Sequence, residues 1–211
     1  MPRRFAQLTF TEHVKAAQAH YGTRAQAERY AESAQANAEL GAREREFIAA
    51  RDSFYLATVS DSGWPYVQHR GGSPGFLQVL DATTLAFADF RGNLQYQSVG
   101  NLAGNDRVCL ILVDYPQRRR LKLLGHARVI DVAAPGGEAP AWLKQLQADA
   151  AEAPVERVLL IAVEAFDWNC AKHITPRFSE RELQPLIDPL RQRIAALEAR
   201  LRELGGVPPE N

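Results

Sequence analysis

The sequence is poor in the residues that build disulfide frameworks, metal clusters and membrane spans. Its 211 residues include only two cysteines, Cys109 and Cys170, which form neither a disulfide framework nor a metal-ligand spacing. No run approaches the ~18 consecutive apolar residues that a membrane helix needs, and the first residues lack the apolar core of a secretion signal. These absences lead us to expect a reduced, cytoplasmic protein with no membrane partner.

An excess of one charge is also missing. Lys and Arg total 25 and Asp and Glu total 25, so the formal net charge is zero. This balance argues against a protein whose main partner is nucleic acid or an anionic membrane. The basic hairpin at 118–122 has no interleaved aromatic residues, and we interpret it as a solvated turn or as a turn from which Arg120 or Lys122 points toward a ligand. Three histidines lie far apart, so we predict no metal site from His69, His126 and His173.

Three parts follow one another along the chain. Residues 1–51 are rich in Ala, Glu, Gln and Arg and predict a helical segment, with two or three helices over 11–51. Residues 52–178 contain β-branched and aromatic runs separated by turns, which predict a domain built of strands. Residues 179–211 predict a C-terminal helix.

The middle part predicts about six strands, joined mostly by short turns. This order is typical of an antiparallel barrel and not of alternating strands and helices. The run RVCLILVDY, at 107–115, is continuously apolar, so we expect both of its faces to be covered. A loop and a short helix are expected at 133–153. The predicted fold class is mainly β with flanking helices (α+β), around a six-stranded antiparallel barrel.

The C-terminal helix carries a heptad stripe. Apolar residues alternate spacings of four and three at Leu190, Ile194, Leu197, Leu201 and Leu204. Pro185 disfavours an uninterrupted helix from Ser179, so we expect the helix to begin at Asp188 and Pro189. The stripe needs a partner, which is either the rest of its own chain or the same helix of a second chain.

A candidate binding motif lies at the end of the second predicted strand, in YVQHRGGSPG. The guanidinium of Arg70 offers a planar set of donors suited to phosphate or carboxylate. Gly71 and Gly72 would let a ligand approach bare backbone. An ordinary surface turn explains the same residues.

A second polar stretch lies between a predicted strand and a short helix. Residues 89–98 supply one guanidinium, three amides and two hydroxyls. The helix that follows adds backbone N–H groups and the positive end of its dipole. This set can hold a phosphorylated ligand. The alternative is a polar loop satisfied by water and its own backbone.

A third candidate segment, DWNCAKHITPRF, follows the last predicted strand. Trp168 can lie against a planar ring, and His173 and Arg177 follow it. The same residues are also explained by a tryptophan that seals the barrel end and an arginine in a surface ion pair. We interpret Cys170 as a small packed side chain, because no base for a nucleophile is near it in sequence.

Together these segments resemble the FMN-binding split-barrel superfamily that includes pyridoxamine 5′-phosphate oxidase. The resemblance covers roughly residues 43–178. It rests on FYLATVSDSGWPYVQHRGG, LAFADFRGNLQYQSVGNLAGNDRVCLILVDY, RRLKLLGHARVI and WNCAKHITPRF. It is closest to an uncharacterised branch of oxidase-like flavoproteins. It implies a split β-barrel and a homodimer with two FMN sites at the subunit interface.

The resemblance also implies roles for individual residues. In the family, a strand-end arginine holds the FMN phosphate, and the strand residues before it lie along the flavin ring. A later segment and a tryptophan complete the site. Carried onto this sequence, the cofactor-binding residues are Val67, Gln68, His69, Arg70, Asn93, Gln95, Tyr96, Ser98 and Trp168. The oxidase has a Ser-Arg-Lys run where this chain has GNLQYQS.

The substrate site departs further from the oxidase. The oxidase holds pyridoxal phosphate with an Arg-x-His motif, whereas here His173 and Arg177 have a different spacing. We therefore do not expect pyridoxamine phosphate to be the substrate, and we take these two residues as candidates for substrate contacts. No catalytic residue is predicted.

The function expected from the resemblance is that of an FMN-dependent oxidoreductase with a small-molecule substrate or redox partner. Two alternatives stay open. One is a non-enzymatic carrier or sensor that binds FMN or haem. The other is a dimeric interaction protein whose working part is the C-terminal heptad helix.

Overall fold

The computed structural model describes residues 2–33, 37–132 and 155–207, so the loop and helix expected at 133–153 lie outside the described residues. The chain forms two compact units. One comprises 1–114 with 119–172, and the other comprises 115–118 with 173–211. No helix in the described part of the chain is both long enough and apolar enough to cross a lipid bilayer.

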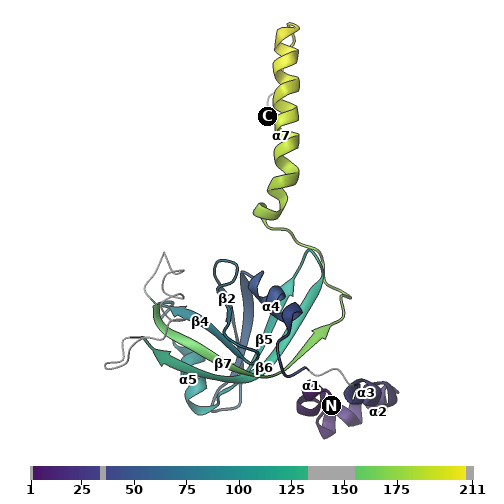
Figure 1. The fold of residues 1–211 in the computed structure, drawn as a ribbon, viewed down its shortest axis with the longest axis vertical. Coiled ribbons are helices and arrows are strands. Elements are labelled where there is room, and N and C mark those ends of the chain that lie inside the picture. The colour runs from purple at the N-terminus through teal and green to yellow at the C-terminus, as the bar shows by residue number, and fades with distance from the viewer. Residues whose placement is uncertain (1, 34–36, 133–154, 208–211) are drawn as a thin grey trace. The chain divides into compact units, whose positions relative to one another are not determined.

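The first unit begins with four short helices (Figure 1). They are α1 (Arg4–Thr9), α2 (Glu12–His20), α3 (Arg24–Glu32) and α4 (Ala42–Ala49). The hydroxyl of Thr11 caps α2 by accepting from the Val14 N–H at 3.4 Å. At the start of α4, the Gly41 N–H donates to the Glu44 carboxylate at 3.1 Å. The helical N-terminal segment expected from composition is therefore present.

The strands form one antiparallel sheet in the order β2-β1-β5-β6-β7-β4-β3. Their bounds are β1 Ser53–Val59, β2 Pro65–Gly71, β3 Gln78–Val79, β4 Thr84–Phe90, β5 Arg107–Asp114, β6 Arg119–Asp131 and β7 Val155–Asn169. One further helix, α5 (Gln97–Gly104), joins β4 to β5 as expected. The sheet has seven strands and not six, because the two-residue β3 pairs with β4 as a separate short edge strand.

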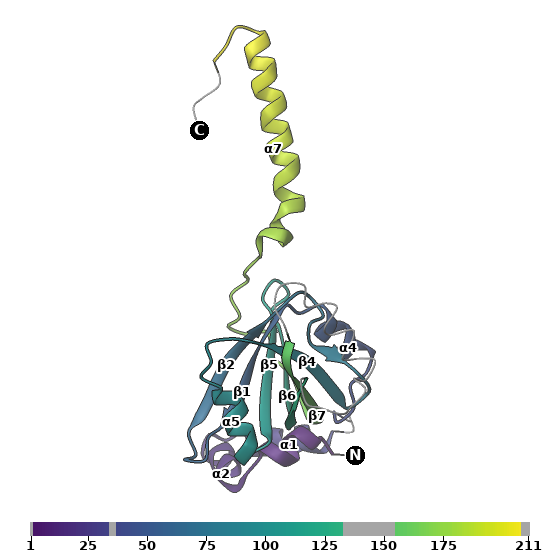
Figure 2. The ribbon, with the colours of Figure 1, turned by 90° about the vertical axis from the view of Figure 1, so that its left-hand side faces the viewer.

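The sheet curls on itself, as Figures 1 and 2 show, and encloses most of the buried apolar side chains. Alternate residues of β1 and β5, among them Leu56, Leu110 and Leu112, are fully buried. Phe54 on β1 meets Phe87 on β4 edge-on, with ring centroids 5.3 Å apart, although the two strands are not neighbours in the sheet. The interior side chains therefore meet across the barrel, and this confirms the mainly β fold class with flanking helices.

The outer face of β5 is only half covered. Cys109, Ile111 and Val113 point away from the core and are partly exposed, whereas the alternate residues are buried. Their neighbour on β1, Tyr55, is 41% exposed. The apolar run at 107–115 therefore has one face in the barrel core and a second apolar face on the barrel surface.

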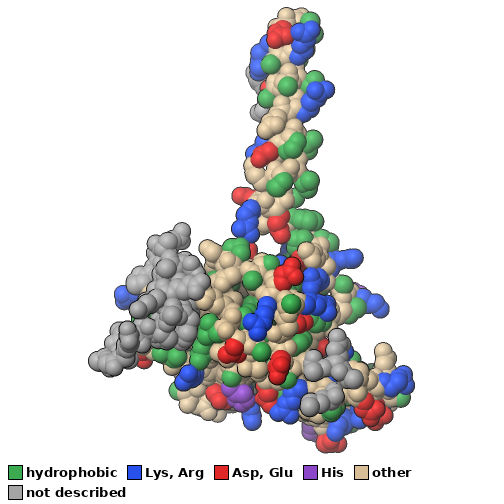
Figure 3. Space-filling view, viewed as in Figure 1, with side chains coloured by type: hydrophobic (Ala, Val, Ile, Leu, Met, Phe, Trp, Pro, Cys, Tyr) green, Lys and Arg blue, Asp and Glu red, His purple; other side chains and the backbone are tan. Residues whose placement is uncertain are grey.

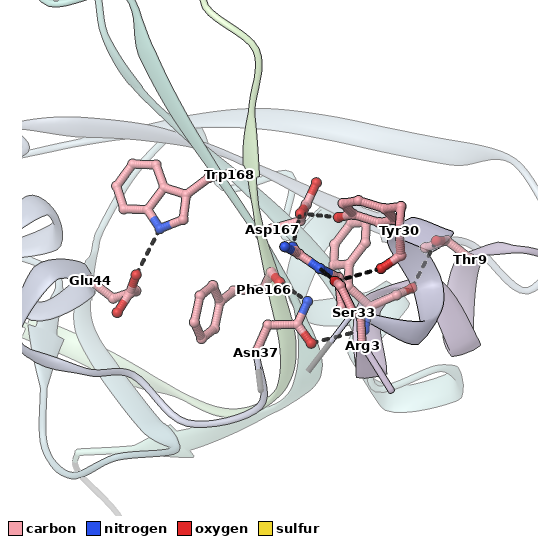
Figure 4. A network of polar contacts seen from close by, with 10 residues as sticks. Arg3, Thr9, Tyr30, Ser33, Asn37, Glu44, Phe166, Asp167 and Trp168 are labelled. Atoms are coloured by element: carbon pink, nitrogen blue, oxygen red, sulfur yellow. Dashed lines mark hydrogen bonds and ion pairs between the residues drawn. The ribbon is translucent and has the colours of Figure 1, made fainter. Parts of the chain in front are cut away.

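A polar network ties the N-terminal segment to the end of β7 (Figure 4). The Asn37 side-chain amide donates to the Phe166 carbonyl at 2.6 Å, and the Phe166 N–H donates to the Asn37 carbonyl at 2.8 Å. The Tyr30 hydroxyl donates to the Asp167 carboxylate, and the Arg3 guanidinium lies 3.5 Å from the same carboxylate. These bonds satisfy the polar groups of both segments where they meet.

In the second unit, α7 runs without interruption from Glu180 to Glu203, so our expectation of a start at Asp188 is wrong. Each internal proline removes one backbone hydrogen bond and crowds the preceding turn. The capping box between Ser179 and Glu182 counters this loss: the Glu182 N–H donates to the Ser179 hydroxyl at 3.3 Å, and the Ser179 N–H donates to the Glu182 carboxylate at 2.8 Å.

We predict that the Tyr30–Asp167 bond makes stability pH-dependent at high pH. Burial and the neighbouring Asp167 carboxylate raise the pKa of Tyr30 to about 12, above its usual 10.0. The neutral phenol is thus favoured in the folded chain, so its contribution is complete below pH 10 and disappears as the pH rises through 12. Tyr30→Phe should cost about 1 kcal/mol in the free energy of unfolding at pH 8.

Urea unfolding of both proteins at pH 8 and at pH values above 10 measures this difference. The gap between wild type and Tyr30→Phe should shrink as the pH rises. Tyr21→Phe is the matched control, because Tyr21 is 76% exposed. A gap that stays constant across this range would contradict the assignment.

Candidate functional site

A small polar cavity lies where the strands β2, β4 and β7 approach the start of α5. Its volume is about 50 Å³, which is room for about three to four waters or one compact polyatomic group. Polar side chains line it, among them Gln68, Arg70, Asp89, Asn93, Ser98 and Arg157. The loop between β4 and α5 closes one side of the cavity.

The centre of the cavity is a buried carboxylate shared by two guanidiniums. Arg70 on β2 lies 2.6 Å from one oxygen of Asp89, and Arg157 on β7 lies 3.0 Å from the other. The exposed fractions of these three side chains are 16% for Arg70, 12% for Arg157 and 6% for Asp89. The cluster follows from sheet pairing, because Asp89 and Arg157 face each other in the β4–β7 register.

The cluster stabilises the charge of Arg157 and leaves one donor of Arg70 without a partner in the described part of the chain. Burial opposes the charge of Arg157, but its hydrogen bond to Asp89 and the charges of Asp89 and Glu156 outweigh burial and raise the pKa of Arg157. The Nε of Arg70 is buried and has no hydrogen-bond partner in the described part of the chain. A buried unpaired donor on a guanidinium is suited to an anionic ligand.

The backbone beside the cavity is strained. Leu94 and Tyr96 have φ angles of 63° and 49°, in the left-handed region that side chains rarely adopt. Tyr96 directly precedes α5 and gives that helix no side-chain cap. Ser98, in the first turn of α5, is 2% exposed, and its hydroxyl donates to the Gln68 side-chain oxygen at 3.0 Å. Strained residues of this kind concentrate at binding sites.

The structure brings together five of the nine residues predicted to bind a cofactor. Those lining the cavity are Gln68, Arg70, Asn93, Tyr96 and Ser98. Gln95 is outside the lining, although its backbone N–H donates to the Asn93 side-chain oxygen at 3.1 Å. Val67 and His69 lie on the opposite face of β2, because successive residues of a strand point to opposite sides.

The glycines after Arg70 are explained by the packing of their own loop. A Cβ on Gly72 would lie 2.8 Å from Phe76, so only glycine leaves room for that ring. Gly75 has a φ of +87°. Close packing and a left-handed turn therefore account for Gly72 and Gly75 without a ligand.

Trp168 lies near the other end of β7, away from the cavity. Its indole N–H donates to Glu44 at 2.7 Å, and its ring meets Phe47 edge-on at 4.8 Å. It lines a second cavity of about 540 Å³, beside the network that joins the N-terminal segment to β7. Eleven strand positions separate it from Arg157, a span of about 35 Å in an extended strand. Within one chain, Trp168 and Arg157 therefore cannot contact the same small ligand.

The two predicted substrate residues belong to the second unit. His173 has a φ of 63°, and the Arg177 guanidinium lies 5.0 Å from the centre of the Tyr115 ring. Their roles stay predictions. Among the described residues, no group of three or more His, Cys, Asp or Glu side chains is arranged to hold a metal ion.

Sequence analysis missed Arg157, and it did not assign Asp89 a binding role. Asp89 was visible as an acidic residue at the end of an apolar strand. Arg157 stands at the start of the last apolar run, where it resembles a solvated strand end. Only the register that pairs the two positions, 68 residues apart, shows that they meet.

The fold and the site define an antiparallel split-barrel protein with an arginine-lined cavity. The family model described as pyridoxamine 5′-phosphate oxidase matches residues 40–169. The chain therefore belongs to the pyridoxamine 5′-phosphate oxidase family. The comparison with curated proteins gives no significant match.

Several solved structures have a similar fold. HupZ of Group A Streptococcus is 15% identical, with a TM-score of 0.49, over 65% of this chain and 99% of its own. A putative pyridoxamine 5′-phosphate oxidase from Lactobacillus delbrueckii is 22% identical, with a TM-score of 0.46, over 61% and 93%. An FMN-binding protein from Syntrophomonas wolfei is 14% identical, with a TM-score of 0.42, over 60% and 83%. At these levels the likeness is one of fold, and no functional argument rests on it.

We predict that Asp89 is required for stability even without ligand. Asp89→Asn removes the carboxylate that two partly buried guanidiniums share and leaves Arg70 without a counter-charge among the described residues, which should lower the free energy of unfolding by about 3 kcal/mol. Glu156→Gln is the matched control, because Glu156 contacts Arg157 but is 28% exposed, and its loss should cost under about 1 kcal/mol. Urea unfolding of the ligand-free variants tests this, and equal stability of the two variants would show that the cluster does not hold the barrel together.

Proposed function

We propose that this protein is an FMN-dependent oxidoreductase that works as a homodimer, with FMN bound where the two subunits meet. The observation that carries the proposal is the cavity cluster: two guanidiniums share one buried carboxylate, and the buried Arg70 Nε is left for another acceptor. Membership of the pyridoxamine 5′-phosphate oxidase family supports FMN as that ligand.

The cavity suits the phosphate of FMN in charge, donors and size. Arg70 and Arg157 would bind the phosphate oxygens, and the uncapped N–H groups at the start of α5 add further donors. Ser98 and Asn93 line the same space. Since the volume of about 50 Å³ admits a phosphate group but no ring system, the flavin ring would lie outside the cavity.

The free edge of β2 is the proposed location of the ring. β2 ends the sheet and pairs only with β1, so the backbone groups on its other side are open to a ligand. Of Val67, Gln68 and His69, those whose backbone N–H and C=O point away from β1 would present these groups. The bound flavin would supply hydride and electron transfer, while these residues bind it, orient it and exclude water from one side.

A second subunit is supported by the outer face of the barrel. In the sheet register, Val67, Ala57 and Cys109 lie in one row across β2, β1 and β5, and Tyr55 and Ile111 lie in the next. Val67 is 60% exposed and Tyr55 41%. A contiguous apolar face of this kind on a barrel wall is suited to pairing with its own copy. The same face carries His69.

The substrate is proposed to differ from pyridoxamine phosphate. The family's Arg-x-His motif for that ligand is replaced by His173 and Arg177 at a different spacing. We retain these two residues as candidates for substrate contacts.

The phosphate assignment predicts a loss of affinity that depends on the phosphate. Arg70→Ala and Arg157→Ala should each weaken FMN binding by about ten- to one-hundred-fold, because each removes a charged hydrogen bond worth about 1.5–3 kcal/mol. Riboflavin, which lacks the phosphate, should bind the variants and the wild type alike. Quenching of flavin fluorescence on titration with protein measures both ligands.

Arg91→Ala is the control for general loss of positive charge, because Arg91 is 65% exposed and does not line the cavity. Its FMN affinity should match that of the wild type. An equal loss of riboflavin affinity in Arg70→Ala would show that the arginine supports the fold and does not bind phosphate.

A mixing experiment tests the position of the site between subunits. If Arg70 of one subunit and Trp168 of the other form one site, Arg70→Ala and Trp168→Ala proteins should each bind FMN weakly. Refolding them together should restore one intact site per mixed dimer, seen as recovered flavin binding. No recovery in dimers that do contain both chains would place each site within one subunit.

A further inference from the structure

The apolar heptad stripe of α7 extends beyond Leu190 toward the start of the helix. Counting back from Leu190 in steps of three and four adds Ile187 and Leu183, both inside the helix. All seven core positions from 183 to 204 are then apolar: Leu183, Ile187, Leu190, Ile194, Leu197, Leu201 and Leu204. The stripe covers three heptads, or about 32 Å of helix.

Within the second unit, no residue that the structure describes buries this stripe. Leu190 is 64% exposed, Ile194 55% and Leu197 53%, and α7 contains no buried residue. Figure 3 shows the apolar side chains standing along the length of α7 between charged ones. A helix with no buried face gains little stability in water, so the stripe requires a covering surface.

The residue types along the stripe favour a two-stranded coil. Ile187, Ile194 and Leu201 occupy a positions, and leucine occupies every d position. β-branched residues at a with leucine at d favour two parallel helices, because these side chains pack best in the knobs-into-holes geometry of a parallel dimer.

The flanking charges offer an attractive contact in the parallel arrangement. In a parallel pair, Arg193 at g lies beside Glu198 at e of the other helix, twice by symmetry. In an antiparallel pair of the same length, Arg193 would lie beside Arg200 and be repelled, while Arg191 at e would lie beside Glu198 and be attracted. Among the described residues, Arg193 has no ion-pair partner in its own chain, and Glu198 would exchange its contact with Arg202, at 3.6 Å, for the contact with Arg193.

The two prolines that first seemed to interrupt the helix do not disturb the seam. Pro185 falls at an f position and Pro189 at a c position, so both lie on the outer side of the helix. The missing backbone hydrogen bonds weaken the first heptad, and the main pairing begins at Leu190.

We propose that α7 forms a parallel two-stranded coiled coil with α7 of a second copy of this chain. The twofold symmetry axis of such a coiled coil runs parallel to the two helices, between them, and can be the axis of a symmetric dimer. The proposal does not depend on flavin binding, and its test uses no flavin.

Cysteine cross-linking in the full-length protein tests the direction and register of the coil. Leu190→Cys places a thiol at a core position, where it faces its own copy in the parallel coil. In a glutathione redox buffer, this variant should form a disulfide-linked dimer to a far greater extent than Gln192→Cys, whose thiol lies on the outer side. Wild type gives the background from the exposed Cys170, and circular dichroism checks that the variants fold.

Charge reversal in the Leu190→Cys protein adds a second readout. Arg193→Glu and Glu198→Arg should each lower the cross-linked fraction several-fold, and the double variant should restore it, because the reversed pair again attracts. In an antiparallel coil, Arg193→Glu alone would raise cross-linking between chains carrying Leu190→Cys and Leu201→Cys.

Three results would overturn the proposal. Cross-linking only in a mixture of Leu190→Cys with Leu201→Cys would indicate antiparallel helices. Equal cross-linking at 190 and 192 would indicate non-specific collision. No cross-linking above background would mean that the stripe is covered by its own chain.

Discussion

The fold and the candidate site depend on one carboxylate. Asp89 on β4 binds Arg70 on β2, although these strands lie far apart in the sheet order and share no backbone hydrogen bonds. Their ion pair therefore spans the opening of the split barrel, next to the contact between Phe54 and Phe87. The interaction that holds the two sides of the barrel together also places a guanidinium in the cavity. The same ion pair therefore contributes to the contact between the two sides of the barrel and to the site.

Stability alone does not explain such a cluster. Burying three charges costs desolvation that packed apolar residues would avoid, so buried ion groups are weak evidence of stabilisation. Here the cost coincides with an unpaired Arg70 Nε and with left-handed backbone at Leu94 and Tyr96. Unpaired buried donors and strained backbone are expected to lie together where residues are selected for ligand binding and not for stability.

Sequence patterns predicted what depends on local chemistry. Alternating apolar residues gave the strands, and the polar stretch before α5 gave most of the cavity lining. Arg157 was not predictable, because its role follows from pairing with Asp89 across 68 residues. The start of α7 was also mispredicted. The prediction judged Pro185 by itself, as a residue that disfavours a helix. It did not include the capping box of Ser179 and Glu182, which stabilises the first turn.

The geometry of β7 bears on assembly. This strand carries Arg157 near its start and Trp168 near its end, about 35 Å apart in an extended strand, which is longer than a mononucleotide can span. If both residues serve one flavin, the tryptophan must come from another chain. A parallel coil of α7 would be compatible with such a dimer, because each arrangement has a twofold axis. Pairing of the helices would raise the effective concentration of one barrel around the other, and so favour a site shared between subunits even where the barrel contact alone is weak.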